Sequence, residues 1–330
     1  MTSHANFWRQ LNKPVFVLAP MVGVTDSAFR QVFAKYGKPD AMFTEFTSAD
    51  GLCSPGRNAV LRQLERTAAE HPLVVQLHSS KPDNFREAAR LVAELGFDGI
   101  DINMGCPAKE VEKFGAGAAL IKKPQLAQEA VWACQDGSGG LPVSVKTRIG
   151  YRCNEIETWL PALLAAEPTA ITLHARTREE ASRVPARWDV VAQAVQIAGA
   201  LVPDAARRPL ILGNGDVDSL PGARARVAET GCDGVMIGRG CFGNPWLFDP
   251  AVVRAELPFP TVLDVMLEHT ALWLSLYQGS RPFEMMKKHF KAYVGGFTGA
   301  PQVRAQLMAA NDFAEVKAIV AGLDNVRLVC

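Results

Sequence analysis

The stretch INMGCPAKEVEKFGAGAAL, residues 102–120, places one cysteine, Cys106, between Asn103 and a loop that contains several glycines. A thiol of ordinary pKa, about 8.5, is mostly protonated at neutral pH, so it can act as a general acid. The same pattern also suits a buried turn, because most cysteines are small apolar core residues. The interpretation of this stretch therefore depends on the elements that surround it.

Short apolar runs rich in β-branched residues recur through the first three quarters of the chain. They cover residues 15–19, 41–46, 73–77, 99–103, 143–147, 170–174, 210–214 and 234–238. Their hydrophobicity is continuous rather than alternating, which is typical of parallel strands covered on both faces. Eight runs separated by amphipathic segments predict an α/β fold, the (β/α)8 or TIM barrel. A doubly wound sheet is disfavoured because APMVGVTD, after the first run, is not a G-x-G-x-x-G fingerprint.

Helix signals lie between these runs and continue after them. Thr25 is placed to cap a helix that Gly37 ends, and Pro82 lies in the first turn of a helix that Gly96 follows. Strand signals stop near residue 250, and the later segments 261–278, 283–297, 303–310 and 312–323 predict three or four helices. We therefore predict a barrel domain over residues 1–250 and a small helical domain over residues 251–330.

The composition restricts the classes of protein and partner. Hydrophobic residues make up 48% of the chain and charged residues 21%, which is typical of a globular protein with a sizeable core. The net charge is only +1, so any contact with nucleic acid must rest on local clustering. We expect no membrane span and no signal peptide, because the chain has no long apolar run and MTSHANFWRQLNK lacks an apolar core. This predicts a cytoplasmic protein, and we expect a monomer.

The cysteines argue against a metal site and against structural disulfides. There are seven, an odd number, and they are scattered without a C-x-x-C pair or a histidine at zinc-finger spacing. We therefore expect no bound metal.

Candidate site residues, most of them polar, follow every predicted strand, at the end where a (β/α)8 barrel carries its active site. In chain order they are Pro20 and Met21, Glu45, Gln76, Asn103 and Cys106, Lys146 and Arg148, His174 and Arg176, Asn214 and Asp216, and Gly238 and Arg239. Taken singly, Gln76 or Asn214 could satisfy loop backbone and His174 could be a hydrogen-bonded core histidine. Lys146 is harder to explain without a ligand, because an ammonium at the end of a buried strand needs an acceptor. The complete ring favours a site.

Two glycine-bearing turns follow the last two strands, over residues 213–219 and 238–246. Loops at these positions commonly hold a phosphate in such barrels, although ordinary βα turns also use glycine. A phosphate there, with Lys146 and Gln76 facing a flat heterocycle, suggests flavin mononucleotide (FMN), whose reduced anion a nearby cation stabilises. Because no dinucleotide fingerprint is present, a nicotinamide would be a transient electron donor.

Several motifs resemble, in order and spacing, those of the tRNA-dihydrouridine synthases. They are APMVGVTDSAFR (19–30), FTE (43–45), Gln76, DINMGCPA (101–108), GAGAALIKKP (115–124), VSVKTRIG (143–150), LHART (173–177), GNGDV (213–217) and DGVMIGRG (233–240). The resemblance implies an FMN-containing barrel with a helical C-terminal domain that binds RNA. It also implies reduction of the 5,6 double bond of selected uridines in tRNA, with NADPH as electron donor.

The resemblance also assigns roles to residues. Cys106 corresponds to the catalytic cysteine, Lys146 to the flavin-contacting lysine, and Asn103 to the uracil-contacting asparagine. The predicted cofactor-binding set is Ala19, Pro20, Met21, Gln76, Lys146, His174, Asn214, Gly215, Asp216, Gly238 and Arg239. The predicted substrate-binding set is Glu45, Asn103, Arg148, Arg176, Lys287, Lys288 and Lys291. In this reaction hydride reaches uracil C6, Cys106 protonates C5, and His174 or Arg176 stabilises the developing enolate oxygen.

A target base in folded RNA must be unstacked, so the enzyme needs a surface for the RNA backbone. Basic residues gather in RPFEMMKKHFKAYVGGFTGAPQVR, residues 281–304. Helical spacing predicts that Met285, Met286, Phe290 and Tyr293 pack while Lys287, Lys288 and Lys291 project, although a solvated helix face would look similar. Gly115 and Gly117 are predicted to let residues 105–117 fold over the flipped base.

Two other functions fit parts of the pattern. One is an FMN barrel acting on a free pyrimidine, like dihydroorotate or dihydropyrimidine dehydrogenases, which the basic helical appendage disfavours. The other is an RNA-binding or phosphate-binding barrel without catalysis, which would be colourless and would not take up FMN.

Overall fold

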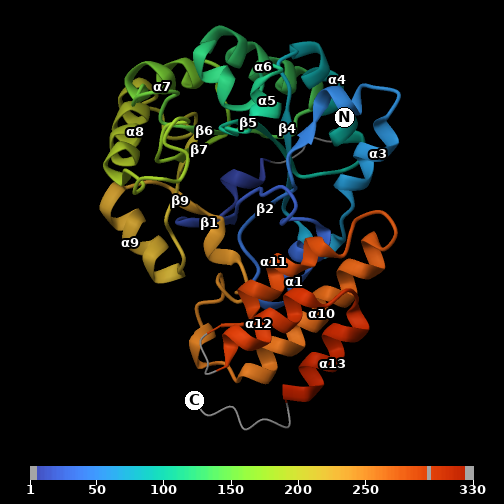
Figure 1. Ribbon diagram of the computed structural model, residues 1–330. Coiled ribbons are helices and arrows are strands. Elements are labelled where there is room, and N and C mark those ends of the chain that lie inside the picture. Colours follow the sequence, from blue (N-terminus) through green and yellow to red (C-terminus); the bar gives the residue numbers. More distant parts are fainter. Residues whose placement is uncertain (1–5, 296–298, 324–330) are drawn as a thin grey trace.

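The computed structural model describes residues 6–295 and 299–323, and its core is a barrel of parallel strands (Figure 1). The strands are β1 (Val15–Leu18), β2 (Met42–Phe43), β3 (Thr47–Ser48), β4 (Leu73–His78), β5 (Gly99–Met104), β6 (Val143–Arg148), β7 (Ala170–His174), β8 (Leu210–Asn214) and β9 (Gly234–Ile237). Their order is β1-β9-β8-β7-β6-β5-β4-β2, with β3 also paired to β4. A parallel bridge between Val17 and Ala41 nearly closes the barrel. The predicted (β/α)8 barrel is confirmed.

Helices separate the strands and surround them in Figure 1. They are α1 (Ser27–Tyr36), α2 (Ala49–Leu52), α3 (Arg57–Leu61), α4 (Pro82–Glu94), α5 (Lys109–Glu112), α6 (Pro124–Gly137), α7 (Ile156–Leu164), α8 (Trp188–Leu201) and α9 (Leu220–Thr230). After the last strand come α10 (Phe259–Tyr277), α11 (Glu284–Tyr293), α12 (Ala300–Ala309) and α13 (Phe313–Leu323). Short 3-10 turns are η1 (Phe7–Arg9), η2 (Arg62–Leu64), η3 (Ala68–Glu70), η4 (Gly117–Lys122), η5 (Arg239–Cys241) and η6 (Arg254–Glu256).

The predicted strand over residues 41–46 is wrong in detail, because only Met42–Phe43 form a strand there, β2, and a second short strand, β3, follows at Thr47–Ser48. Phe43 pairs with Val74 and Thr47 pairs with Leu77, so four steps along one strand match three along the other. The extra residue is a bulge, in which the Thr44 hydroxyl accepts the Gln76 N–H at 3.2 Å. Bulges re-aim side chains, and this one lies beside Glu45 at the rim of the barrel.

The α1 helix starts one residue later than predicted. Asp26, not Thr25, is its N-cap and accepts a hydrogen bond from the Phe29 N–H at 3.1 Å. The Thr25 hydroxyl instead accepts from the Met21 N–H at 2.9 Å, which braces the loop after β1. The predicted end of this helix at Gly37 is confirmed.

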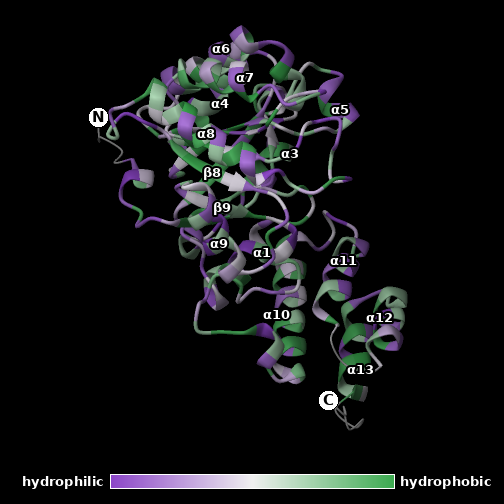
Figure 2. Cartoon of the chain, turned by 90° about the vertical axis from the view of Figure 1, so that its left-hand side faces the viewer, coloured by the Kyte–Doolittle hydropathy of each residue, from purple (hydrophilic) through white to green (hydrophobic). Residues whose placement is uncertain are grey.

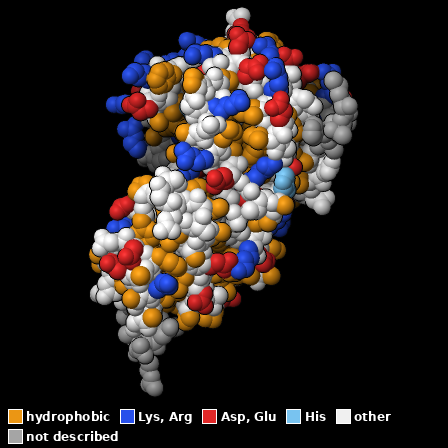
Figure 3. Space-filling model, turned by 90° about the vertical axis from the view of Figure 1, so that its right-hand side faces the viewer, with side chains coloured by type: hydrophobic (Ala, Val, Ile, Leu, Met, Phe, Trp, Pro, Cys, Tyr) orange, Lys and Arg blue, Asp and Glu red, His pale blue; other side chains and the backbone are white. Residues whose placement is uncertain are grey.

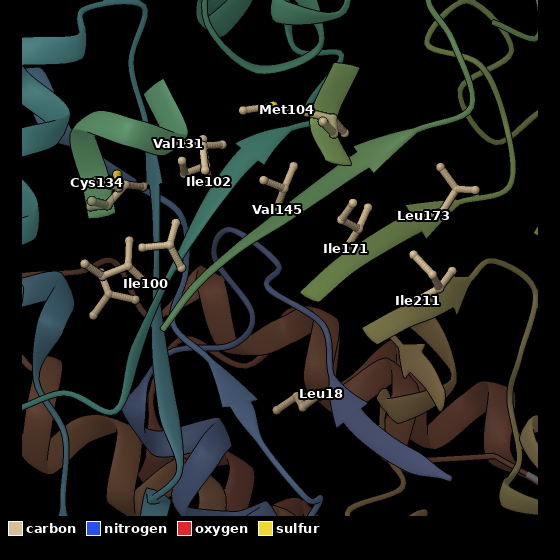
Figure 4. Close-up of a cluster of buried hydrophobic side chains, with 14 of the residues drawn as sticks. Leu18, Ile100, Ile102, Met104, Val131, Cys134, Val145, Ile171, Leu173 and Ile211 are labelled. Carbon is tan, nitrogen blue, oxygen red and sulfur yellow. The ribbon is translucent and has the colours of Figure 1, made fainter. Parts of the chain in front are cut away.

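The two faces of each strand have different partners. Ile100, Ile102 and Met104 of β5 belong to the apolar layer between the strands and the outer helices, and Figure 4 shows the first two beside Val131 and Cys134 of α6. The alternate residues, Asp101 and Asn103, are buried without belonging to an apolar cluster. On β7 and β8 the inward-facing residues lie opposite one another in register, Ala170 with Leu210, Thr172 with Leu212, and His174 with Asn214, and the first of these pairs is apolar. The barrel interior therefore changes from apolar to polar toward the carboxyl ends of the strands.

The helices α10 to α13 share a hydrophobic cluster that also includes Ala28 and Val32 of α1. Polar contacts join the same surfaces, since the Trp273 indole donates to Asp26 at 3.1 Å and Tyr277 accepts from the Ser27 N–H at 3.1 Å. The packing of α1 thus couples the helical segment to the loop after β1. The division at residue 250 stays a prediction.

Among residues 6–295 and 299–323, no helix combines the length and apolar content needed to cross a membrane. Six of the cysteines lie in this described part and are free thiols; Cys330 lies outside it.

Candidate active site

A cavity of about 550 Å³ opens at the carboxyl ends of β1, β6, β7, β8 and β9. Ten of the eleven predicted cofactor-binding residues line it: Ala19, Pro20, Met21, Lys146, His174, Asn214, Gly215, Asp216, Gly238 and Arg239. Gln76 is not part of the lining. Sequence reasoning missed Ser182, Val217, Asp218, Met236 and Gly240. Of these, Met236 could have been predicted from the sequence, because it lies between Val235 and Ile237, which face the outer helices, and so must face the barrel interior.

Lys146 is the cation in the cavity wall. Its ammonium donates to the Asn214 amide oxygen at 3.2 Å, and the Asn214 amide nitrogen donates to the Met236 carbonyl at 2.8 Å. Burial, with the neighbouring Arg148 charge, lowers the pKa of Lys146 to about 8. No carboxylate in the described part of the chain forms an ion pair with it. The Lys146 ammonium therefore has no directly bonded carboxylate, and an anionic ligand in the cavity would stabilise it.

His174 and Arg176 form a fixed pair at the end of β7. An Arg176 N–H lies 3.2 Å from His174 Nε2, and Arg176 also donates to the Val184 carbonyl at 2.5 Å and to Asp216. Burial and the surrounding cations, Lys146 first, lower the pKa of His174 far below its ordinary value. The histidine is therefore neutral, and Arg176 binds the loops after β7 and β8 together.

A chain of buried hydrogen bonds runs from Asp101 to the Cys106 loop. Asp101 accepts from the Ser144 hydroxyl at 2.6 Å and from the Gln76 amide nitrogen at 2.7 Å. Gln76 accepts in turn from the Asn103 amide nitrogen at 2.9 Å. Because Asp101 when ionised can only accept, it sets the orientation of both amides.

The orientation of these amides determines what the Asn103 side-chain oxygen can bond. The Asn103 oxygen is left facing the loop, where it accepts the N–H groups of Gly105 at 3.1 Å and Cys106 at 2.9 Å. Asn103 and Gln76, predicted to contact substrate and cofactor, are thus both engaged by the protein. Burial dominates the electrostatics of Asp101 and raises its pKa to about 6.

Cys106 is half-buried and is held through its backbone on both sides. Besides its N–H bond to Asn103, its carbonyl accepts the Ala118 N–H at 3.0 Å. Burial raises the pKa of the thiol above its ordinary value, and the charges of Arg148 and Lys146 oppose this only partly. The thiol is therefore protonated at neutral pH, which is the form that can donate a proton.

Arg148, predicted to bind substrate, is buried, and its guanidinium group donates to three backbone carbonyls. It bonds the Gly105 carbonyl at 2.8 Å, the Thr177 carbonyl at 3.0 Å and the Ala181 carbonyl at 3.1 Å. It therefore joins the Cys106 loop to the loop after β7.

The remaining predicted substrate residues lie where α11 meets the barrel. Glu45 is buried, accepts from the Gly23 N–H, and pairs with Arg281 at 3.0 Å. Lys288 does not project, contrary to the helical-spacing prediction, because its ammonium donates to the Gly23 carbonyl. Lys291 is exposed and Lys287 half-buried, while Met286, Phe290 and Tyr293 are buried as predicted.

Known proteins match the chain along nearly its whole length. The family model for dihydrouridine synthase (Dus) matches residues 17–327. A probable tRNA-dihydrouridine synthase 2 of Bacillus subtilis (strain 168) is 39% identical over 326 residues, which are 98% of each chain. The chain belongs to the dihydrouridine synthase family. A probable tRNA-dihydrouridine synthase of Staphylococcus aureus (strain Mu50) is 38% identical over 318 residues, 96% of this chain and 94% of its own.

Solved structures of lower identity share the fold of this dihydrouridine synthase family member. Histamine dehydrogenase from Rhizobium sp. 4-9 superposes with a TM-score of 0.55 at 14% identity, over 78% of this chain and 48% of its own. The structure of TcOYE with pHBA gives a TM-score of 0.52 at 12% identity, over 72% of this chain and 88% of its own. These likenesses support the barrel alone.

One glycine of the family motif GAGAALIKKP touches the Cys106 loop directly. Gly117 has a φ of +61°, and a Cβ there would lie 2.8 Å from the Cys106 carbonyl oxygen. We expect Gly117→Ala to lower the free energy of unfolding by about 1–3 kcal/mol and to slow catalysis by displacing Cys106. Denaturant titration and turnover would measure this.

A matched control separates the effect of a positive φ from the effect of the contact with the Cys106 carbonyl. Gly231 has a φ of +70° but open space around its Cβ position. Gly231→Ala should therefore lose stability without losing activity. Equal activity of the Gly117 and Gly231 variants would contradict the role given to this contact.

Proposed function

We propose that this protein reduces the 5,6 double bond of uridines in tRNA to dihydrouridine, with FMN as cofactor and NADPH as transient electron donor. Membership of the dihydrouridine synthase family supports the reaction class. The observation that carries the proposal is that a backbone-anchored thiol, whose charged neighbours include Lys146, lies at the same end of the barrel as the pocket that Lys146 lines.

The pocket residues fit an anionic flavin nucleotide. Lys146 offers a positive charge without an ion-pair partner in the described chain, and Arg239 is 67% exposed in its side chain although it contacts Asp216. Gly215 and Gly238 lie in the turns that would receive the phosphate, and Gly215 has a φ of +128°. When bound, reduced FMN would supply the hydride to uracil C6.

The chain's own residues would complete the reaction. The Cys106 thiol would give its proton to uracil C5, and the raised pKa keeps that proton in place at neutral pH. Neutral His174 would offer a hydrogen bond without adding charge beside Lys146. Arg148 and Arg176 would act by fixing the loops, since their guanidinium groups bond to protein atoms.

The proposal is tested with purified protein and unmodified tRNA transcripts. We expect a yellow flavin spectrum, NADPH-dependent conversion of uridine to dihydrouridine measured by mass spectrometry of nucleosides, and no conversion of free uracil. Turnover of free uracil or dihydroorotate without RNA would favour the free-pyrimidine function. A colourless protein that takes up no FMN would contradict both enzymatic functions.

The pKa of Lys146 allows a separate test of whether this residue binds FMN. Burial lowers this pKa to about 8, so the ammonium loses its proton as pH rises through that value. We expect the affinity of apoprotein for FMN to fall from pH 7 to pH 9, and Lys146→Met to bind about tenfold more weakly at pH 7 without that fall. Flavin fluorescence titration would measure both.

Lys35→Met is a suitable control for this prediction, because Lys35 is exposed, does not line the cavity, and pairs with Glu268 of α10. That variant should keep the wild-type affinity and its pH dependence. A Lys146→Met variant with wild-type behaviour would remove this residue from the cofactor site.

A further inference from the structure

We propose that the turn at residues 109–114 is a second RNA contact, in which Phe114 stacks on an unpaired base and Lys109 and Lys113 bind the adjoining phosphates. The inference rests on the proposed function, and it concerns a surface outside both the cavity and α11. Its elements are an exposed aromatic ring, a rigid backbone beneath it and a local excess of positive charge.

Phe114 is the most exposed large hydrophobic residue in the described part of the chain, with 66% of its surface accessible. Its backbone is nevertheless fixed, because the Phe114 carbonyl accepts the Ser80 hydroxyl at 2.6 Å and its N–H donates to the Val111 carbonyl at 3.3 Å. An aromatic ring presented on fixed backbone loses little conformational entropy when a flat partner stacks on it.

The charge around the ring favours a polyanion. Lys109 and Lys113 are exposed one helical turn apart, and the Lys113 ammonium lies 6.0 Å from the Phe114 ring centroid. Of the two acids in this turn, Glu112 is neutralised by its ion pair with Arg178, whereas Glu110 is exposed and offsets one lysine charge. Lys81, also exposed, follows the serine that holds the Phe114 carbonyl. An aromatic ring among lysines is the arrangement that binds unpaired RNA bases.

The position of this turn relates it to the active site. It continues directly from the Cys106 loop, and Figure 2 shows α5 on the same edge of the molecule as α11. Figure 3 shows Lys and Arg side chains gathered along the edge of the barrel where α5 lies. An RNA that places a base beside Cys106 would therefore meet α5 on one side and α11 on the other.

The test compares Phe114→Ala, Phe114→Trp and Lys109→Ala/Lys113→Ala in the FMN-loaded, full-length protein. The probe is an unmodified tRNA transcript, and binding is measured by filter retention over a range of salt concentrations. We expect Phe114→Ala to raise Kd about tenfold with an unchanged salt slope, because stacking is not electrostatic. The double lysine variant should reduce the salt slope by about 1–2. Phe114→Trp should keep wild-type affinity and show quenching of the added indole fluorescence by RNA.

Trp132→Ala is the matched control, because Trp132 is another exposed aromatic, 47% accessible, on the outer helix α6. It should bind RNA like the wild type. A Phe114→Ala affinity within twofold of wild type, or an equal loss in Trp132→Ala, would overturn the proposal. So would a change in sedimentation of Phe114→Ala without a change in RNA binding, since that would identify the turn as a contact between copies of the chain.

The outcome is separable from that of the proposed function. FMN content and the rate of NADPH oxidation with ferricyanide as acceptor should be the same in all Phe114 variants. If wild-type protein binds the transcript but forms no dihydrouridine, the reaction fails while the Phe114 result is still informative.

Discussion

Replacing Cys106 with alanine should lower the rate of dihydrouridine formation at least about 100-fold, the range attributed to general acid catalysis. Flavin content, flavin reduction by NADPH and RNA affinity should stay at wild-type values. The thiol is the group that changes, because the backbone of Cys106 is held by Asn103 at 2.9 Å and by Ala118 at 3.0 Å regardless of the side chain. Single-turnover conversion of a tRNA transcript, measured by mass spectrometry, would follow the loss.

The pH dependence of the rate and a control at Cys153 test the same role of Cys106. Burial raises the pKa of Cys106, so the protonated form that donates should persist past pH 8.5, where an ordinary thiol is half ionised. With saturating FMN, which offsets the weaker cofactor binding expected above pH 8, the wild-type single-turnover rate should therefore fall only at higher pH. Cys153→Ala, at an exposed free cysteine, should leave the rate unchanged. Turnover of Cys106→Ala within tenfold of wild type would remove Cys106 as proton donor.

Replacing Asp101 with leucine should slow uridine reduction about 100-fold, although this side chain does not line the cavity. Leucine is of similar size but cannot accept from Gln76, so the Gln76 and Asn103 amides lose the carboxylate that orients them. The Asn103 side chain can then rotate, so its oxygen is no longer held toward the Cys106 N–H and the Cys106 loop shifts. Stopped-flow measurement of the two half-reactions would show uridine reduction slowed while flavin reduction by NADPH is unchanged.

Two further variants distinguish positioning from a loss of stability. In Asp101→Asn the amide oxygen can still accept from Gln76 while the Ser144 hydroxyl turns to accept from the new amide nitrogen, so most of the activity should return. Ser144→Ala removes one contact to Asp101 but leaves the amide orientation intact, and should lose less than about tenfold. If Asp101→Asn is as slow as Asp101→Leu, the acceptor does not control the loop.

Stability gives an independent readout for Asp101. The pKa of this buried carboxyl is raised to about 6, so its ionised form costs stability that increases as pH rises from its unfolded pKa of 3.8 to about 6. Asp101→Asn removes that cost and should be at least as stable as wild type at pH 7.

The fold could be predicted from local patterns because its elements are regular. Eight apolar runs correspond to strands or strand pairs, and the polar residues after them converge at one end of the barrel. The exception, residues 44–46, depends on how the chain pairs with β4, where the Thr44 hydroxyl replaces a backbone acceptor. A bulge of this kind leaves no trace in hydrophobic periodicity.

The sequence by itself determined which residue types stand at the carboxyl ends of the strands, and hence Cys106, Lys146 and the glycine turns of the pocket. Periodicity and strand counting were sufficient, because parallel strands in a barrel bring those ends together. Only the tertiary structure decided which of these residues are turned toward the protein instead of the cavity. Arg148 and Glu45 bind atoms 43 and 236 residues away in sequence, to Gly105 and Arg281. Such partners depend on the distances between loops that approach each other after folding, and local spacing carries no information about those distances.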